Sequence, residues 1–169
     1  VHAGGAVVQL DDAAFRAITR SQEPHGVAAV VRQPWATLPE RPQRHVWLAF
    51  EALRSTGNLG TAIRSAAAAG AHGIILVGDT IDPFDPQVLR ATMGAIFHQR
   101  IVRADPDQLL RWKRATGCTV IGASAGEGRD FRRVTYRRPL VLMMGSERHG
   151  LSPAQARLVD QAVRIPMTG

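Results

Sequence analysis

The strongest constraint on the fold of this chain is an alternation of short apolar runs with segments of helical pattern. The apolar runs are VWLAF, GIILVG, CTVIGAS and PLVLMMG, and they all follow residue 45. The segments NLGTAIRSAAAAG, PQVLRATMGAIF and PDQLLRWKRA lie between them and are predicted to be helices. Apolar runs separated by helices are typical of a mostly parallel sheet with helices on both faces. We therefore predict an α/β fold.

The part of the chain before these runs has a different pattern. Two apolar runs, VHAGGAVVQL and GVAAVV, flank a helical segment that a pair of aspartates can cap. We therefore expect a strand, a helix and a strand within residues 1–31, as the remnant of a separate domain. Three prolines break the regular pattern over residues 32–44, which we interpret as a linker. The main domain is then expected at residues 45–169.

The charge of the chain favours a polyanionic partner. Its 169 residues carry a formal net charge of +7, with 20 arginines and the single lysine Lys113. Such an excess attracts RNA or DNA through its phosphates. The alternative is that the arginine content reflects the base composition of a genome, which explains the choice of arginine over lysine better than the net charge.

The composition also argues against several other classes of protein. No apolar stretch approaches the roughly 20 residues that a membrane span needs, and no signal peptide pattern is present. We therefore expect a cytoplasmic protein. The single cysteine, Cys118, cannot form an internal disulfide, and we interpret it as a buried strand residue. Asp79, Asp82 and Asp85 alternate with prolines and are expected to form turns, so no metal site is predicted.

The segment STGNLGTAIRSAAAAG is the first candidate for a functional site. We expect Asn58 in a loop after the strand VWLAF and Arg64 on the first turns of the following helix, where open α/β sheets bind ligands. A helix dipole disfavours a cation near its N-terminus, so a substrate explains Arg64 better. The alternative is a solvated arginine on an exposed helix face. The loop lacks the patterns of dinucleotide and phosphate-binding loops.

The segment PLVLMMGSERHGLS is the second candidate. A buried strand leads directly into Gly145, Ser146, Glu147 and Gly150, and two glycines around a polar pair allow a tight turn. A flat ligand such as adenine could then approach the backbone of Met144 and Gly145. The alternative is an ordinary turn before a helix capped by a serine, SPAQARLV, and both interpretations are compatible. The terminal segment VRIPMTG is a short apolar strand broken by proline.

Taken in this order, the three segments resemble the SpoU/TrmH type of the SPOUT superfamily of RNA ribose methyltransferases. The family's three motifs match this sequence at the following positions: Asn58, Gly60 and Arg64; Gly145, Glu147, Gly150 and Leu151; and Ile165, Pro166 and Met167. The intervening RATMGAIFHQRIV is also similar to the family's small-residue helix and following strand. The resemblance covers the chain from about Val46 to Gly169.

The resemblance implies a SPOUT-type fold of the trefoil-knot family. In that family the third motif continues into a loop and a final helix that complete the knot, so we expect the knot tail to be missing from this chain and the domain to be incomplete at its C-terminus. Residues 1–31 are similar to the end of an N-terminal RNA-recognition domain that many relatives carry. We therefore expect the chain to be cut short at both ends.

The resemblance also implies a reaction, in which a methyl group passes from S-adenosylmethionine to a ribose 2'-hydroxyl of RNA without a metal. The catalytic residues would be Arg64, Asn58 and Glu147. Arg64 is the family's key residue, but guanidinium is almost always protonated, so we expect it to hold the target phosphate and stabilise the developing alkoxide. The implied cofactor-binding residues are Ala123, Ser124, Ala125, Met144, Gly145, Ile165 and Met167.

The implied partners are RNA and a second copy of the chain. A basic loop interleaved with Phe131 and Tyr136 could grip RNA through phosphates and stacking, and its arginines are Arg129, Arg132, Arg133, Arg137 and Arg138. The alternative is a solvated charged loop. Ribosomal RNA is favoured over tRNA by the expected N-terminal remnant, and homodimers by the family. The alternative function is a non-catalytic RNA-binding module of the same fold.

Overall fold

A computed structural model describes residues 5–19, 23, 25–78, 80–124, 128–146 and 150–166 of the chain. The chain divides into two compact units, Val1–Gln33 and Pro34–Gly169.

The first unit contains the helix α1 (Asp12–Thr19), as the sequence predicts. Its first turn is capped by Asp11, whose Oδ1 accepts a hydrogen bond from the Ala14 N–H at 2.8 Å. The strands expected on either side of α1 are wrong for the described residues, which form no strand there. Val7 and Val30 are 99% and 98% exposed. Within the described part of this unit the apolar runs pair with no other strand, so their sequence pattern alone does not produce a sheet.

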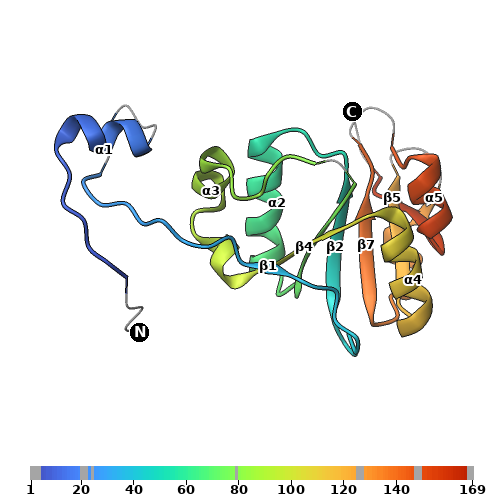
Figure 1. The fold of residues 1–169 in the computed structure, drawn as a ribbon. Helices are drawn as coiled ribbons and strands as arrows, with labels where there is room; N and C mark the ends of the chain where they lie inside the picture. Colours follow the sequence, from blue (N-terminus) through green and yellow to red (C-terminus); the bar gives the residue numbers. More distant parts are fainter. Residues whose placement is uncertain are drawn as a thin grey trace. The chain divides into compact units, whose positions relative to one another are not determined.

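The second unit is built on a single sheet of eight strands in the order β1-β4-β3-β2-β7-β5-β8-β6 (Figure 1). Every strand pairing is parallel, which confirms the predicted α/β class. The strands are β1 (Trp35–Ala36), β2 (Val46–Glu51), β3 (Gly73–Val77), β4 (Arg100–Ala104), β5 (Thr119–Ser124), β6 (Arg129–Asp130), β7 (Leu140–Met144) and β8 (Gln161–Arg164).

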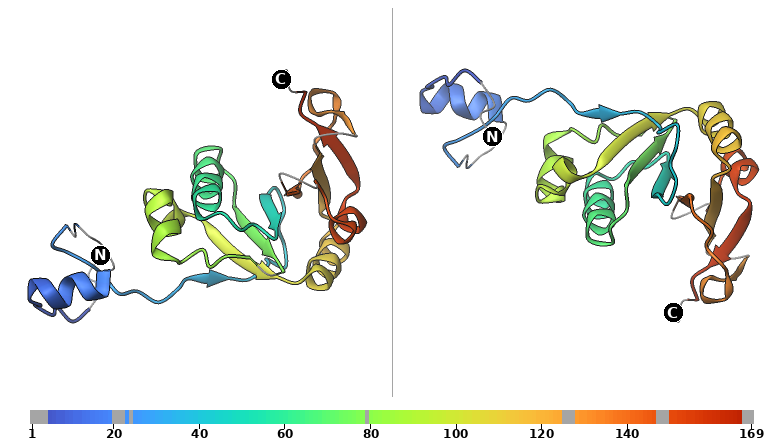
Figure 2. Two further views of the ribbon diagram at one scale, coloured as in Figure 1. Left: turned by 90° about the horizontal axis from the view of Figure 1, so that it is seen from above. Right: turned by 90° about the horizontal axis from the view of Figure 1, so that it is seen from below.

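Helices cover both faces of this sheet (Figure 2). One face packs against α2 (Thr56–Ala68), α3 (Pro86–Thr92) and the 3-10 helix η1 (Ala95–His98), with Leu59, Ile63 and Ile96 in its core. The other face packs against α4 (Pro106–Thr116), and Leu158 of α5 (Pro153–Leu158) joins the same core. The remaining short helix is the 3-10 helix η2 (Phe131–Arg133).

One part of the sheet has a small core cluster of its own, to which none of the described α-helices contributes a residue. Ile121 of β5, Leu140 of β7 and Val163 of β8 form a small cluster with the partly buried Val46, Val134 and Leu142. Along β2, Val46 lies on the same side as Leu48 and Phe50, which pack against the α2 core. The cluster therefore lies on the α2 side of the sheet, beyond the end of the helical layer.

Two local features differ from the prediction or add to it. The helix expected over PQVLRATMGAIF is interrupted, because Met93 (φ 50°) and Gly94 (φ 84°) adopt left-handed conformations that end α3 and begin η1. Two of the three predicted turn formers before α3 are confirmed: Asp82 accepts from the Phe84 N–H and Asp85 caps α3 through the Gln87 N–H. The third, Asp79, lies outside the described residues. Among the described helices, none is both long and apolar enough to cross a membrane.

Candidate functional site

The centre of the sheet, between β2 and β7, is a point where the chain direction diverges. After β2 the chain enters α2 on one face, and after β7 it enters α5 on the other. The two strands are parallel neighbours, with Phe50 opposite Met144 at their carboxyl ends. Open α/β sheets bind ligands in the crevice that such a divergence leaves outside the strand ends.

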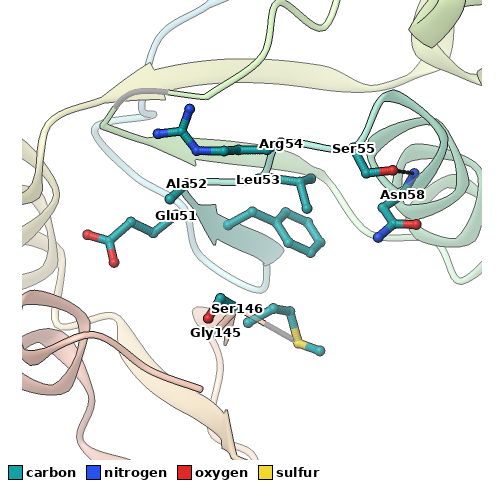
Figure 3. Close-up of a pocket in the computed structure, with 10 residues that line it drawn as sticks. Glu51, Ala52, Leu53, Arg54, Ser55, Asn58, Gly145 and Ser146 are labelled. Atoms are coloured by element: carbon teal, nitrogen blue, oxygen red, sulfur yellow. Dashed lines mark hydrogen bonds between the residues drawn. The ribbon is translucent and has the colours of Figure 1, made fainter. Parts of the chain in front are cut away.

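A cavity of about 520 Å³ lies at this point, and we call it the switch-point cavity (Figure 3). Its lining comes from the end of β2, the start of α2 and the end of β7. Figure 3 shows Glu51 and Arg54 extending to one side, Asn58 on the other, and the turn of Gly145 and Ser146 between them. The lining residues are Phe50, Glu51, Ala52, Leu53, Arg54, Ser55, Asn58, Met144, Gly145 and Ser146.

Asn58 belongs to α2 and not to the preceding loop, so that part of the prediction is wrong. Ser55 is the N-cap of α2, and its Oγ accepts a hydrogen bond from the Asn58 N–H at 3.3 Å. A serine cap satisfies a free N–H of the first turn, and the helix accordingly starts at Thr56, two residues before Asn58. Asn58 therefore reaches the cavity from the first turn of a helix.

Arg64 lies two turns further along α2 and its side chain is exposed. It is not among the lining residues of the switch-point cavity. Its turn follows Gly60, which is buried against α3: a Cβ at Gly60 would lie 2.3 Å from the Cβ of Ala91. Arg64 therefore stands on the exposed surface of α2, one turn beyond the contact between α2 and α3.

A second cavity, of about 460 Å³, extends over the small core cluster of Ile121, Leu140 and Val163 and is mostly apolar. We call it the sheet groove. Three of the predicted cofactor-binding residues line it, namely Ala123, Met144 and Ile165. Met144 also lines the switch-point cavity, so the two cavities share this residue. The complete lining is Val46, Ile121, Ala123, Phe131, Tyr136, Arg138, Leu140, Leu142, Met144, Val163 and Ile165.

The described residues that follow β7, Gly145, Ser146 and Gly150, lie close together. Ser146 and Gly150 exchange two backbone hydrogen bonds, at 2.8 and 3.0 Å. A Cβ at Gly145 would lie 2.2 Å from the carbonyl carbon of Gly150, so no larger residue fits without moving backbone. The Met144 carbonyl accepts a hydrogen bond from Gln155 Nε2 at 3.0 Å.

The other predicted site residues fall into two groups. Ser124 is half-buried at the carboxyl end of β5, next to Ala123. Glu147, Ala125 and Met167 lie outside the described residues, so the structure does not report on their positions.

The basic loop between β5 and β7 is exposed at all five predicted arginines, Arg129, Arg132, Arg133, Arg137 and Arg138. Arg132 forms an ion pair with Asp130, with Nη2 and Oδ2 2.6 Å apart. The hydrogen bond from Arg132 lowers the pKa of Asp130 well below its usual range, and the same bond raises the pKa of Arg132. Arg138 lines the sheet groove, while the Tyr136 hydroxyl donates to the Phe131 carbonyl.

Sequence reasoning missed three polar residues that line the switch-point cavity: Glu51, Arg54 and Ser55. One signal was present in the sequence, because Glu51 is a charged residue directly after the apolar run VWLAF. A charged side chain at the carboxyl end of a parallel strand stands where ligands bind.

The family profile that matches this chain and two of its relatives are all named for rRNA methylation. Residues 45–169 match the sequence profile of the SpoU rRNA Methylase family. The chain is 35% identical over 158 residues to a 23S rRNA (uridine(2479)-2'-O)-methyltransferase of Streptomyces viridochromogenes, covering 89% of this chain and 55% of that protein. It is 31% identical over 160 residues to the 23S rRNA (guanosine(2553)-2'-O)-methyltransferase RlmP of Bacillus subtilis, covering 95% and 63%.

Solved structures agree with these relatives. The crystal structure of an rRNA methyltransferase from Sinorhizobium meliloti is similar with a TM-score of 0.90 at 39% sequence identity, covering 98% of this chain and 65% of that one. The chain thus spans between half and two thirds of the length of these three relatives.

Proposed function

Because the chain belongs to the SpoU rRNA Methylase family, we propose that it transfers a methyl group from S-adenosylmethionine to a ribose 2'-hydroxyl of ribosomal RNA. The proposal follows the names of the relatives at 35% and 31% identity, which are both 23S rRNA 2'-O-methyltransferases. The similar rRNA methyltransferase from Sinorhizobium meliloti also has an AdoMet-bound crystal structure.

The observation that carries the proposal is that the two cavities share one lining residue, Met144. A methyl transferase needs a donor site and an acceptor site that meet at the reacting atoms. The sheet groove has the apolar lining that suits an adenosyl group, and its volume is in the range of about 300–1,000 Å³ for small-molecule sites. The switch-point cavity carries the polar side chains that suit a ribose and its phosphate.

The cofactor would be held in the sheet groove, largely by backbone groups and apolar side chains. Gly145 would contribute by allowing the Gly150 backbone to approach within 2.2 Å of its Cβ position, which brings the backbone of both residues to the end of β7. When bound, S-adenosylmethionine supplies a methyl group activated by a sulfonium. The proposed contacts are Ala123, Ser124, Ala125, Met144, Gly145, Ile165 and Met167.

The protein's own part in the reaction is alignment and electrostatic stabilisation. Asn58 and Glu147 would orient the ribose at the strand ends, and Asn58 already lines the switch-point cavity. The Arg64 guanidinium stays protonated, so it would hold the target phosphate and stabilise negative charge on the 2'-oxygen. Since Arg64 is exposed on α2, it would meet the RNA from the surface of the protein.

We propose three further properties on the same basis. The exposed arginines of the basic loop would bind RNA phosphates, with Arg132 partly neutralised by Asp130. The protein would act as a homodimer, as the SpoU/TrmH resemblance implies. It would work in the cytoplasm, where ribosomal RNA is its substrate.

A transfer assay tests the proposed function. The protein would be incubated with methyl-labelled S-adenosylmethionine and either 23S rRNA or tRNA, and the RNA then hydrolysed in alkali. A 2'-O-methyl group blocks attack by that oxygen, so we expect label in alkali-resistant dinucleotides from 23S rRNA. Label only in tRNA would correct the substrate, and label on a base would refute 2'-O transfer. RNA binding without any transfer would favour the non-catalytic RNA-binding module.

A further inference from the structure

Glu51 is a charged residue at the end of a buried stripe on β2. Trp47 and Ala49, which precede it at alternate positions of the same strand, are fully buried in the core under α4 and α5. Alternation along a strand places Glu51 on this face too. Its side chain is half-buried and also borders the switch-point cavity.

Glu51 is the first member of a chain of hydrogen bonds to the end of β7. The Ser152 hydroxyl donates to Glu51 Oε2 at 2.5 Å and accepts from the Gln155 N–H at 3.1 Å. The Ser152 N–H donates to Gln155 Oε1 at 2.8 Å, and Gln155 Nε2 donates to the Met144 carbonyl at 3.0 Å. The chain therefore joins the two neighbouring strands β2 and β7 through the start of α5.

The orientation of Gln155 follows from these contacts. Its side chain is 2% exposed, and its amide oxygen is held by Ser152, so its amide nitrogen must point toward Met144. Met144 is the residue that the sheet groove and the switch-point cavity share. A displacement of Ser152 would thus be transmitted to the wall between the two cavities.

An ordinary helix cap does not require the carboxylate. The capping box of α5 is complete with Ser152 and Gln155 alone, and a capping hydroxyl can donate its proton to water. The bond from Ser152 to Glu51 is additional, and it joins residues 101 positions apart in the sequence. It fixes α5 to the end of β2 at the edge of the cavity.

We propose that Glu51 is a positioning residue, which holds Ser152 and Gln155 and through them the Met144 carbonyl at the wall between the donor and acceptor sites. This inference rests on the proposed function, because the two cavities are donor and acceptor sites only if the protein is a methyltransferase. Glu51 acts through other residues and takes no proton from the substrate.

The first test compares methyl-transfer kinetics of Glu51→Ala, Glu51→Gln and Ser152→Ala. Misplacement of reacting groups by about 1 Å can cost on the order of 10²-fold in rate, so we expect kcat to fall about tenfold or more in Glu51→Ala. Glu51→Gln keeps an oxygen that accepts from Ser152 and should stay within a few-fold of the wild type. Glu40→Ala, at an exposed glutamate, is the matched control and should leave kcat unchanged.

Ser152→Ala separates positioning from direct contact with RNA, because Ser152 lines neither cavity. It should reproduce the loss of kcat, and the double variant with Glu51→Ala should be little worse than either single variant, since both break one connection. A loss in Glu51→Ala that Ser152→Ala does not share, or losses that multiply in the double variant, would overturn the inference.

Hydrogen exchange tests the same connection without relying on activity. Amides of residues 150–159 should exchange faster in Glu51→Ala than in the wild type, and at wild-type rates in Glu51→Gln. Unchanged exchange in Glu51→Ala would refute the positioning role. If the wild type binds no S-adenosylmethionine, the proposed function fails. Even then, faster exchange of residues 150–159 in Glu51→Ala than in Glu51→Gln would support the connection through Glu51.

Discussion

Gly60 allows α2 and α3 to approach closely, and its replacement by alanine tests that contact. A Cβ at Gly60 would lie 2.3 Å from the Cβ of Ala91 and 3.0 Å from the Ala91 carbonyl carbon. Non-bonded carbons usually approach to about 3.5–4.0 Å, so the two helices must separate locally by roughly 1.2 Å or more. The atoms in the way include backbone, so no side-chain rotation relieves the clash.

The expected magnitude follows from two opposing effects. Overpacking of a buried contact costs about 1–3 kcal/mol, whereas alanine in place of glycine inside a helix stabilises it by about 1 kcal/mol. We therefore expect Gly60→Ala to lower the free energy of unfolding by up to about 2 kcal/mol. Because the displaced helix carries Asn58 and Arg64, transfer activity should fall as well.

The matched control is Gly57→Ala in the same helix. A Cβ at Gly57 would meet only Ser55 Oγ, at 3.9 Å, so this variant should be as stable as the wild type or up to about 1 kcal/mol more stable. Urea unfolding followed by circular dichroism measures both variants, with an unchanged denaturant slope as the check that the same state unfolds. If Gly60→Ala proved as stable as Gly57→Ala, the inferred contact between α2 and α3 would be wrong.

Three further predictions concern other parts of the structure. Arg64→Ala should lower kcat about 10²-fold without changing the melting temperature. The control Arg111→Ala, at another exposed arginine, should leave kcat unchanged. Equal kcat values for the two variants would show that Arg64 takes no part in the reaction. Lys113→Met should lower the free energy of unfolding in urea by about 1 kcal/mol, because Lys113 Nζ donates to the Leu158 carbonyl and to Asp160; no change would show that these bonds add nothing. Burial raises the pKa of the Cys118 thiol to about 12, so iodoacetamide at pH 8 should label it only after unfolding; rapid labelling of the folded protein would contradict its burial.

The strands and helices of the second unit could be predicted because each is encoded locally. The apolar runs became β2, β3, β5 and β7, and a capping box starts α5 at Ser152. The errors came from effects that a local pattern does not contain. The N-terminal valines have strand propensity but no partner strand, and the left-handed turn at Met93 and Gly94 interrupts a segment of continuous helical pattern.

The candidate site could be predicted only in part, because most of it depends on which strands are neighbours. The motif residues Asn58, Met144 and Gly145 do meet at the switch-point cavity. Glu51 and Arg54 were missed, since their place in the site follows from the pairing of β2 with β7, which lies far along the chain. For Arg64 the reverse holds: the sequence motif suggests a catalytic role, but Arg64 lines neither of the two described cavities.

We propose that the sheet groove and the backbone after β7 form the S-adenosylmethionine site. Calorimetric titration of S-adenosylmethionine into the wild type and into Gly145→Ala measures this binding. We expect saturable binding by the wild type and binding at least about tenfold weaker in Gly145→Ala, because a Cβ there meets the Gly150 backbone at 2.2 Å and must displace it. Absence of binding by a folded wild type that still binds RNA would contradict the claim and favour a non-catalytic RNA-binding module.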